Sequence, residues 1–211
     1  SREIIIKIPL VANPNGGTDA QVSIPINGRG FSEFDTQNSL TKDAITPKLK
    51  IGTQLFASLE TRYYTNDGDQ LGIGPLPPEA GKETKFWIFV TIENTTSKVN
   101  DVAFSARLPG NISWTGKSSV SQGQDVSFNT GSRTISWETQ SLAAHASAGI
   151  YMEVAFTPGS GDVGRVPTVL ENIRISGVDS FIGGSIERAL GPLKADFRQD
   201  KKALEMGILV Q

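Results

Sequence analysis

Apolar and polar residues alternate along several short segments of this chain. The alternation is clearest over 102–108 and 150–156, where every second residue is apolar: Val102, Phe104, Ala106, Leu108, Ile150, Met152, Val154 and Phe156. A period of two predicts β-strands with one buried face. Several such strands at short, regular spacing predict an all-β fold, an antiparallel β-sandwich.

The most apolar segment is 85–94. Phe86, Ile88 and Val90 would share one face of a strand, and Trp87 and Phe89 the other. An apolar load on both faces predicts a central strand. A hairpin is predicted farther along, around the turn 129–132. We expect the large aromatic residues to lie in the core between two sheets: Trp87, Phe104, Phe128, Trp137 and Phe156.

The first 65 residues give a weaker pattern. Alternation over 4–10 and 22–26 predicts two strands, and Pro9 and Pro25 mark them as edge strands or bulged strands. A looser stretch follows over 27–47, and 48–65 is a long strand or a bent pair. Two strands are too few for a stable sandwich. We therefore expect residues 1–47 to complete a sheet with 48–65, with a preceding segment or with a neighbouring subunit.

These patterns suggest three parts of the chain. Residues 1–65 would form an N-terminal β module, incomplete or shared with a neighbour, residues 66–200 a sandwich, and residues 201–211 a C-terminal tail or linker. The sequence starts at Ser1 on a strand-like run, which favours a piece of a longer protein.

Composition narrows the classes of function. The chain of 211 residues has 20 basic and 22 acidic residues and no basic stripe, so we expect no nucleic-acid partner. No apolar run approaches the roughly 20 residues that span a bilayer. Zero cysteines exclude disulfides and thiolate metal sites within the chain.

Several motifs resemble those of a known family. They lie in 74–88, which contains Pro77-Pro78, in 92–95 and 100–102, and in Leu108-Pro109-Gly110 with Trp114. Ile135-Ser136-Trp137, Leu142, 154–158 and 172–183 agree with the second half of the pattern. Together they are similar to the immunoglobulin-like (Ig-like) repeat domain of large cell-surface proteins of bacteria, especially of small-genome candidate phyla, and of archaea.

The resemblance covers roughly residues 48–200. It implies an Ig-like sandwich in an extracellular structural or adhesive protein, and it carries no catalytic residue. This chain has His145 at a turn where the repeats usually have glycine. Residues 1–47 match no part of the family.

Candidate catalytic groups are few. A Ser-His-Asp triad would need His145, the single histidine, which lies in a turn of small residues and favours a solvated side chain. Glu60, Glu93 and Glu153 could pair for glycoside hydrolysis, but each lies on the polar phase of a strand. We interpret them as residues of an ordinary solvated sheet face, and we expect no catalytic residue and no cofactor.

Three binding signals remain. Asn66, Asp67 and Asp69 offer clustered oxygen ligands for calcium, although a turn needs the same residue types. Three tryptophans on different strands, Trp87, Trp114 and Trp137, could form a sugar-stacking platform, although core packing is more typical. Asn94-Thr95-Thr96 and Asn111-Ile112-Ser113 fit the glycosylation pattern, which carries little meaning in bacteria.

The sequence therefore predicts a non-catalytic structural or adhesive module of an extracellular cell-surface protein. Its strand edges and loops would contact neighbouring modules, and a glycan or protein ligand is a further partner. The alternative is a carbohydrate-binding module that uses exposed tryptophan. An exposed coplanar aromatic pair would favour it, and buried tryptophans would argue against it.

Overall fold

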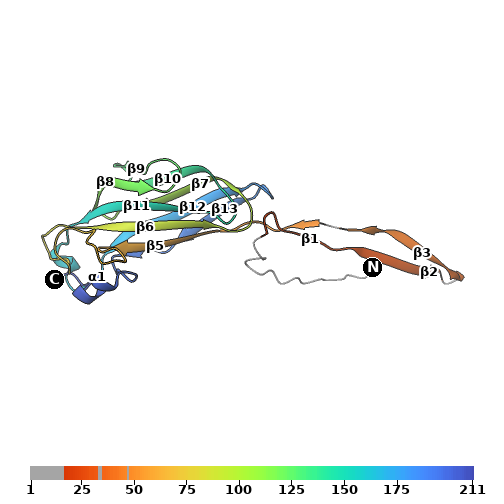
Figure 1. Cartoon of the computed structure of the whole chain (residues 1–211), viewed down its shortest axis with the longest axis horizontal. Coiled ribbons are helices and arrows are strands. Elements are labelled where there is room, and N and C mark those ends of the chain that lie inside the picture. Colours follow the sequence, from red (N-terminus) through yellow and green to blue (C-terminus); the bar gives the residue numbers. More distant parts are fainter. Residues whose placement is uncertain (1–16, 33–34, 47) are drawn as a thin grey trace.

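The computed structural model describes residues 17–32, 35–46 and 48–211, and of residues 26–45 it describes the backbone alone. Two sheets pack face to face in its main body (Figure 1). The first contains, in spatial order, β5 (Leu55–Arg62), β6 (Thr84–Asn94), β11 (Ser147–Phe156) and β8 (Ile112–Val120). The second contains β13 (Ser185–Leu190), β12 (Thr168–Asp179), β7 (Val99–Arg107), β10 (Thr134–Leu142) and β9 (Ser127–Asn129), and β14 (Leu193–Lys194) also pairs with β12.

The strand order is that of an immunoglobulin-like sandwich. β5-β6-β11-β8 corresponds to strands A-B-E-D of that fold, and β13-β12-β7 to G-F-C. Every strand pair among these is antiparallel. β10 and β9 extend the second sheet beside β7, where variable-type domains add two strands. They follow β8 in the chain, which departs from the variable-type order. The expected all-β sandwich is thus confirmed.

The core confirms the alternation along β7 and β11. Their inner-face residues, together with Leu108 directly after β7, are buried between the sheets: Val102, Phe104, Ala106, Leu108, Ile150, Met152, Val154 and Phe156. Trp137 is 1% exposed, and its indole Nε1 donates to the carbonyl of Gln122 at 3.1 Å. The hairpin β9–β10 places Phe128 opposite Ile135, and Phe128 packs half-buried against the core.

Trp87 was wrongly predicted to lie in the core. β6 is central, as expected, but its inner face consists of Phe86, Ile88, Val90 and Ile92. Successive residues of a strand point to opposite faces, so Trp87 lies half-buried on the outer face. Because both faces of β6 carry large side chains, ring size alone was a poor guide to the inner face.

The segment before the sandwich forms a two-stranded arm, which we define as residues 17–50. β1 (Gln21–Ser23) pairs with β4 (Lys48–Lys50), and β2 (Ile26–Ser32) pairs with β3 (Asp35–Ile45). In Figure 1 the arm leaves one end of the sandwich, and β2 and β3 extend away from it. The looser stretch expected over 27–47 is thus wrong, because most of its described residues lie in β2 and β3.

The N-terminal expectations had mixed outcomes. Pairing of β1 with β4 agrees with the expected link between 1–47 and 48–65, and β4 and β5 form the expected bent pair. Pro25 lies in the break between β1 and β2. The predicted strand at 4–10, with Pro9, lies outside the described residues.

At the other end of the sandwich, η1 (Ser160–Asp162) follows β11, and helix α1 (Lys201–Met206) precedes the last residues of the chain (Figure 1). Asp200 is 2% exposed and caps α1 by accepting the N–H of Ala203 at 3.0 Å. Its other oxygen accepts the N–H groups of Tyr63 and Tyr64 at 2.8 and 2.7 Å. One carboxylate therefore joins the end of β5 to α1.

The division into residues 1–65, 66–200 and 201–211 stays a prediction, and two sets of contacts cross its boundaries. β5 pairs with β6 over eight residue pairs, from Leu55–Asn94 to Arg62–Trp87. Ala203 and Val210 belong to the buried core. We therefore propose that the sandwich unit extends from about residue 51 to residue 211. Within the described part of the chain, no helix is long and apolar enough to cross a lipid bilayer.

Asp200→Ala tests whether the last eleven residues belong to this unit. It would leave three N–H groups without an acceptor, at about 1–3 kcal/mol each, so we expect unfolding free energy to fall by at least about 3 kcal/mol in urea. Asp196→Ala is the matched control. Its carboxylate contacts Arg198 at the surface, so the loss should stay under about 1 kcal/mol. Equal losses in the two variants would contradict the proposed unit.

Candidate functional site

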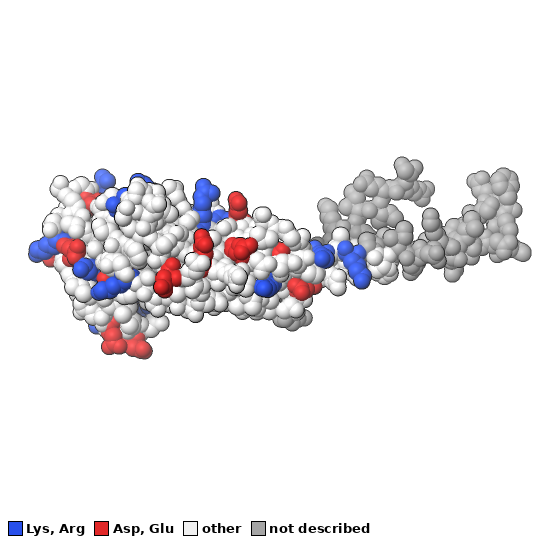
Figure 2. Space-filling view, turned by 90° about the horizontal axis from the view of Figure 1, so that it is seen from above, with Lys and Arg blue, Asp and Glu red and all other residues white. Residues whose placement is uncertain are grey.

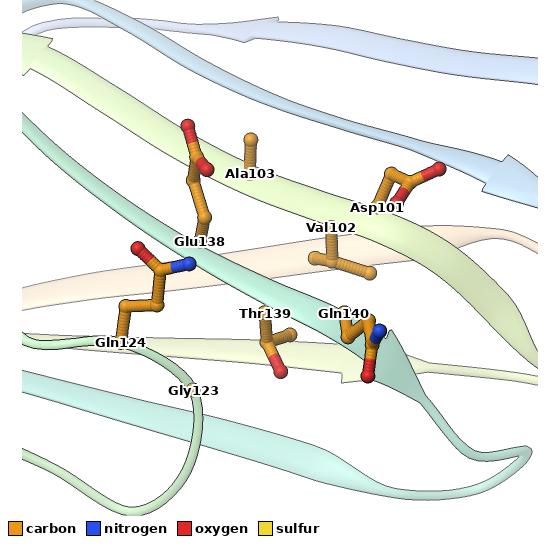
Figure 3. Close-up of a pocket in the computed structure, with 8 residues that line it drawn as sticks. All are labelled: Asp101, Val102, Ala103, Gly123, Gln124, Glu138, Thr139 and Gln140. Atoms are coloured by element: carbon orange, nitrogen blue, oxygen red, sulfur yellow. The ribbon is translucent and has the colours of Figure 1, made fainter.

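A polar hollow of about 590 Å³ lies along β7 and β10 (Figure 3). Glu138 and Asp101 come from these two neighbouring strands, and Gln124 comes from the loop before β9. Val102 and Thr139 point to the opposite side of the sheet in the same view. The lining carboxylates and amides can hydrogen-bond to a polar ligand. None of the catalytic, metal-binding or sugar-binding candidates from the sequence lines this hollow.

The calcium candidates form an exposed turn between β5 and β6. Gly68 has φ +92°, and the N–H of Asp69 donates to Thr65 Oγ1 at 3.0 Å. The guanidinium of Arg62 donates to Asn66 Oδ1, so a positive charge occupies an oxygen that calcium would need. In the part of the chain that the structure describes, no three histidine or carboxylate side chains gather as a metal site. Calcium at Asn66, Asp67 and Asp69 stays a weak prediction.

His145 lies in the exposed turn between β10 and β11. Its N–H donates to the carbonyl of Thr95 at 2.8 Å, and its ring Nε2 lies 3.3 Å from the carbonyl oxygen of Gly17 in the arm. Its φ of +59° is a left-handed conformation that favours glycine. Glycine, which the resemblance leads us to expect at this turn, would adopt this φ without strain. His145 contacts the arm, and no carboxylate pairs with it in the described residues.

The three glutamates lie on the outer face of the first sheet, but Glu153 corrects the expectation of a solvated position. It is only 2% exposed. Two extra residues of β8 bulge opposite it, since Val154 pairs with Trp114 and Met152 with Ser118. From this bulge Lys117 Nζ reaches Glu153 Oε1 at 3.2 Å.

The second oxygen of Glu153, Oε2, is buried and finds no hydrogen-bond partner among the described residues. An unsatisfied buried acceptor of this kind costs about 1–3 kcal/mol. Glu60 instead pairs with Arg62, through Nε to Oε1 at 3.0 Å. Glu93 is exposed.

The expected alternative, a platform of three tryptophans, is wrong. Trp137 lies in the core, and Trp114 packs against Phe128 at 5.7 Å between ring centroids with a 59° tilt. Trp87 lies on the outer face of the first sheet. Trp137 and Trp114 face the interior between the sheets and Trp87 faces outward, so the three rings cannot form one platform. The preference for packing roles holds for Trp137 and Trp114.

The arm joins the sandwich through a buried polar cluster. Asp179 is fully buried: Oδ2 accepts the N–H of Thr53 at 2.6 Å, and Oδ1 accepts that of Phe181 at 2.8 Å. Asn94 accepts from Thr53 Oγ1 at 2.7 Å, and its amide donates to the carbonyls of Ser97, Leu142 and Ala143. This arrangement fixes the connection between β4 and β5.

Backbone contacts then hold the arm itself. The N–H of Asp19 donates to the carbonyl of Thr96 at 3.0 Å, and that of Ile51 to Ala20 at 2.8 Å. Lys50 Nζ donates to the carbonyl of Phe181 at 2.9 Å and lies over its ring at 4.5 Å from the centroid. We call these contacts, with the cluster around Asp179, the arm joint.

The glycosylation pattern falls on two different environments. All hydrogen-bonding groups of the Asn94 amide are used inside the arm joint, so this asparagine is inaccessible to modification. Asn111 is half-buried, and its amide donates to Asp162 Oδ2 at 3.3 Å.

The last residues of the chain are held at the opposite end of the sandwich. Gly164 N–H donates to the carbonyl of Val210 at 2.9 Å, and Val210 N–H to that of Arg165 at 3.2 Å. On the other side, Gln211 N–H donates to Pro78 at 2.8 Å, and Ala80 N–H to Gln211 at 2.7 Å. We call this set of contacts the C-terminal clip.

Tyr63 supports the same end. Its hydroxyl donates to the carbonyl of Gly74 at 2.5 Å. Burial raises the pKa of Tyr63, the neighbouring Tyr64 raises it further, and a hydrogen bond from Gln70 acts in the opposite direction. The phenol therefore stays protonated at neutral pH and keeps its role as donor.

The arm joint was missed by the sequence analysis. Asp179 and Thr53 are 126 residues apart, and nothing in a local pattern pairs them. The only sequence signal for the arm joint was the presence of polar residues at strand ends. Such residues are also typical of ordinary turns, so they did not distinguish this joint.

No protein-family model matches the chain, and no curated protein matches it by sequence. Among solved structures it is similar to the major pilin subunit BcpA of Bacillus cereus, with 12% identity over 80% of this chain and 47% of that chain, at a TM-score of 0.44. The full-length major pilin SpaD of Corynebacterium diphtheriae gives 9% identity over 74% and 44%, at 0.41. A structure of Fap1 fimbriae of Streptococcus parasanguinis gives 10% over 66% and 88%, at 0.31.

The chain spans less than half the length of the two pilin structures. Identities this low with TM-scores below 0.5 support no statement about function. The sandwich topology of this chain rests on its own strand order.

Substitutions at His145 test the left-handed turn beside the arm joint. A left-handed backbone costs an ordinary residue about 1–2 kcal/mol, and a β-branched residue is worse. We expect His145→Gly to match or exceed the parent stability and His145→Val to fall at least about 1 kcal/mol below His145→Gly, as measured by urea unfolding. If the two variants were equally stable, the φ argument would be wrong.

Proposed function

We propose that this chain is a non-catalytic structural and adhesive module of an extracellular cell-surface protein, joined end to end to neighbouring modules. One observation carries the proposal: the arm joint and the C-terminal clip lie at opposite ends of the sandwich (Figure 1). A module joined to neighbours at these two ends would lengthen a linear assembly and would transmit tension along its strands.

The contacts of β5 support a load-bearing role. Tension on the arm pulls β5 along its own axis, because β5 starts at the arm joint. Its eight residue pairs with β6 are then loaded in shear, and Asp200 fastens the far end of the strand. Hydrogen bonds loaded in parallel share the force, whereas bonds peeled from a strand end break one at a time.

The surface chemistry is consistent with contacts to other modules. On the face seen in Figure 2, acidic and basic side chains are interspersed. The absence of nucleic-acid partners and of catalysis remains part of the proposal. The cell-surface location rests on the resemblance of residues 48–200 to surface repeats. A partner other than a neighbouring module would need a binding surface of its own.

Single-molecule pulling tests the load path. The sequence contains no cysteine, so two introduced cysteines are the only attachment points. Leu49→Cys with Gln211→Cys loads the sandwich end to end, and Ser119→Cys with Glu187→Cys pulls across the exposed edge strands β8 and β13. We expect the end-to-end pair to unfold at clearly higher force. A lower or equal force would contradict the load-bearing role.

Labelling of intact cells tests the location. An antibody raised against the sandwich should bind unpermeabilised cells of the natural source, and mild external protease should remove the signal. A cytosolic protein is the control and should be labelled only after permeabilisation. If this chain behaved like the control, the extracellular assignment would be wrong.

A further inference from the structure

Two aromatic rings, Tyr151 and Phe89, lie in contact on the outer face of the first sheet. Tyr151 on β11 extends along the sheet over Gly149: a Cβ built on Gly149 would lie 2.5 Å from Tyr151 Oη and 2.8 Å from its Cζ. Glycine at this position therefore lets the phenol ring lie flat against the strand. Phe89, the cross-strand partner on β6, meets it at 4.8 Å between centroids and 79°, so Phe89 stands nearly upright beside the flat ring.

Hydrogen-bonding groups border these rings. A hollow of about 250 Å³ adjoins Phe89 and is lined also by Ser58, Glu60 and Thr91. Glu60 is oriented by two contacts with Arg62, Nε to Oε1 at 3.0 Å and Nη2 to Oε2 at 3.3 Å. The carboxylate and two hydroxyls therefore meet a ligand in a defined geometry.

Glu153 and Trp87 lie on the other side of the rings. Glu153 follows Tyr151 by two residues on β11, so it faces the same side about 7 Å away. It pairs across the strands with Trp87. Its Oε2 is buried and has no hydrogen-bond partner among the described residues, and the Lys117 side chain that reaches Oε1 is 61% exposed. A ligand donor would therefore reach this oxygen only after a side chain that covers it had moved.

We propose that this face binds a carbohydrate chain, with one pyranose ring stacked on Tyr151 against Phe89. Its hydroxyl groups would donate to Glu60 in the hollow, and the next residue of the chain would approach Trp87 and Glu153. We call the surface made by Glu60, Phe89, Tyr151, Trp87 and Glu153 the aromatic face. This binding goes beyond the load-bearing role, which does not depend on it.

A sugar fits this surface better than an apolar peptide or a second copy of the chain. A pyranose has an apolar C–H face for an aromatic ring and a rim of hydroxyl donors for carboxylates. Two of these half-buried rings each lie opposite a glutamate of the neighbouring strand, Glu60 beside Phe89 and Glu153 beside Trp87. An apolar partner would cover the Glu60–Arg62 pair and the hydroxyls of the hollow and would offer them no hydrogen bond, which costs free energy.

Titration with oligosaccharides tests the proposal. Cellohexaose, chitohexaose, mannohexaose and galactohexaose would each be titrated into the whole chain by calorimetry. The summed fluorescence of the three tryptophans, of which Trp87 lies on this face, would be a second signal. We expect at least one to bind. Tyr151→Leu, which removes the ring, should weaken that binding roughly tenfold, whereas Tyr151→Phe, which keeps it, should leave affinity within about twofold.

Two further variants separate the aromatic face from general effects. Gly149→Ala forces the Tyr151 ring off the strand and should also weaken binding. Phe56→Ala removes an aromatic residue that is 42% exposed elsewhere on the same sheet, and it should bind like the parent. Thermal melting confirms that each variant is folded, and Tyr151→Phe with Phe56→Ala still decides the question if Gly149→Ala fails to fold.

The proposal is wrong if no oligosaccharide binds at about 10 mM, which corresponds to affinity weaker than about 3 kcal/mol. It is also wrong if Tyr151→Leu binds as well as the parent, or if Phe56→Ala abolishes binding. None of these results would change the outcome of the pulling experiment. Absence of sugar binding would therefore contradict the binding proposal and not the load-bearing role.

Discussion

Backbone N–H groups at the ends of the strands must find acceptors, and in this protein two buried aspartates meet that requirement. Asp179 accepts three N–H groups at the arm joint, and Asp200 accepts three at the opposite end. Each carboxylate lies in the interior, where an unpaired donor would be costly. The sandwich between them depends on both, because they fix where β5 enters and where the last segment docks. The two ends therefore share one chemical solution although they connect different elements.

The sequence could predict what local periodicity encodes. Phe104 and Phe156 were placed correctly because one face of β7 and of β11 is apolar. The prediction for Trp87 was wrong because both faces of β6 are apolar, so the alternation did not distinguish the inner face from the outer face. The prediction that Glu153 is solvated was wrong for another reason. Its burial depends on a bulge in a different strand, β8, and the alternation along β11 carries no information about β8. Strands β2 and β3 were not predicted because their residues are largely polar, and a polar strand shows no alternation of apolar and polar residues.

The candidate sites followed the same division. His145 was recognised as a turn residue from its small neighbours, and its φ of +59° is one that glycine adopts without strain. The acidic turn at Asp67 and Asp69 was recognised as a turn. The arm joint and the aromatic face could not be found, because the first depends on contacts across 126 residues and the second on a glycine that leaves room for a ring. Long-range contacts and side-chain orientation lie beyond what spacing along the chain can encode.

The bulge of β8 also matters where many copies of such a module are crowded together. β8 is an edge strand, and an edge strand with a regular backbone is a template on which another copy can add a strand. The residues Thr115, Gly116 and Lys117 interrupt that regularity, since Gly116 has φ +85° and the three residues lie opposite the single residue Glu153. The bulge that buries Glu153 thus also disfavours aggregation through the edge of β8. Removing the bulge would lower the solubility of the protein.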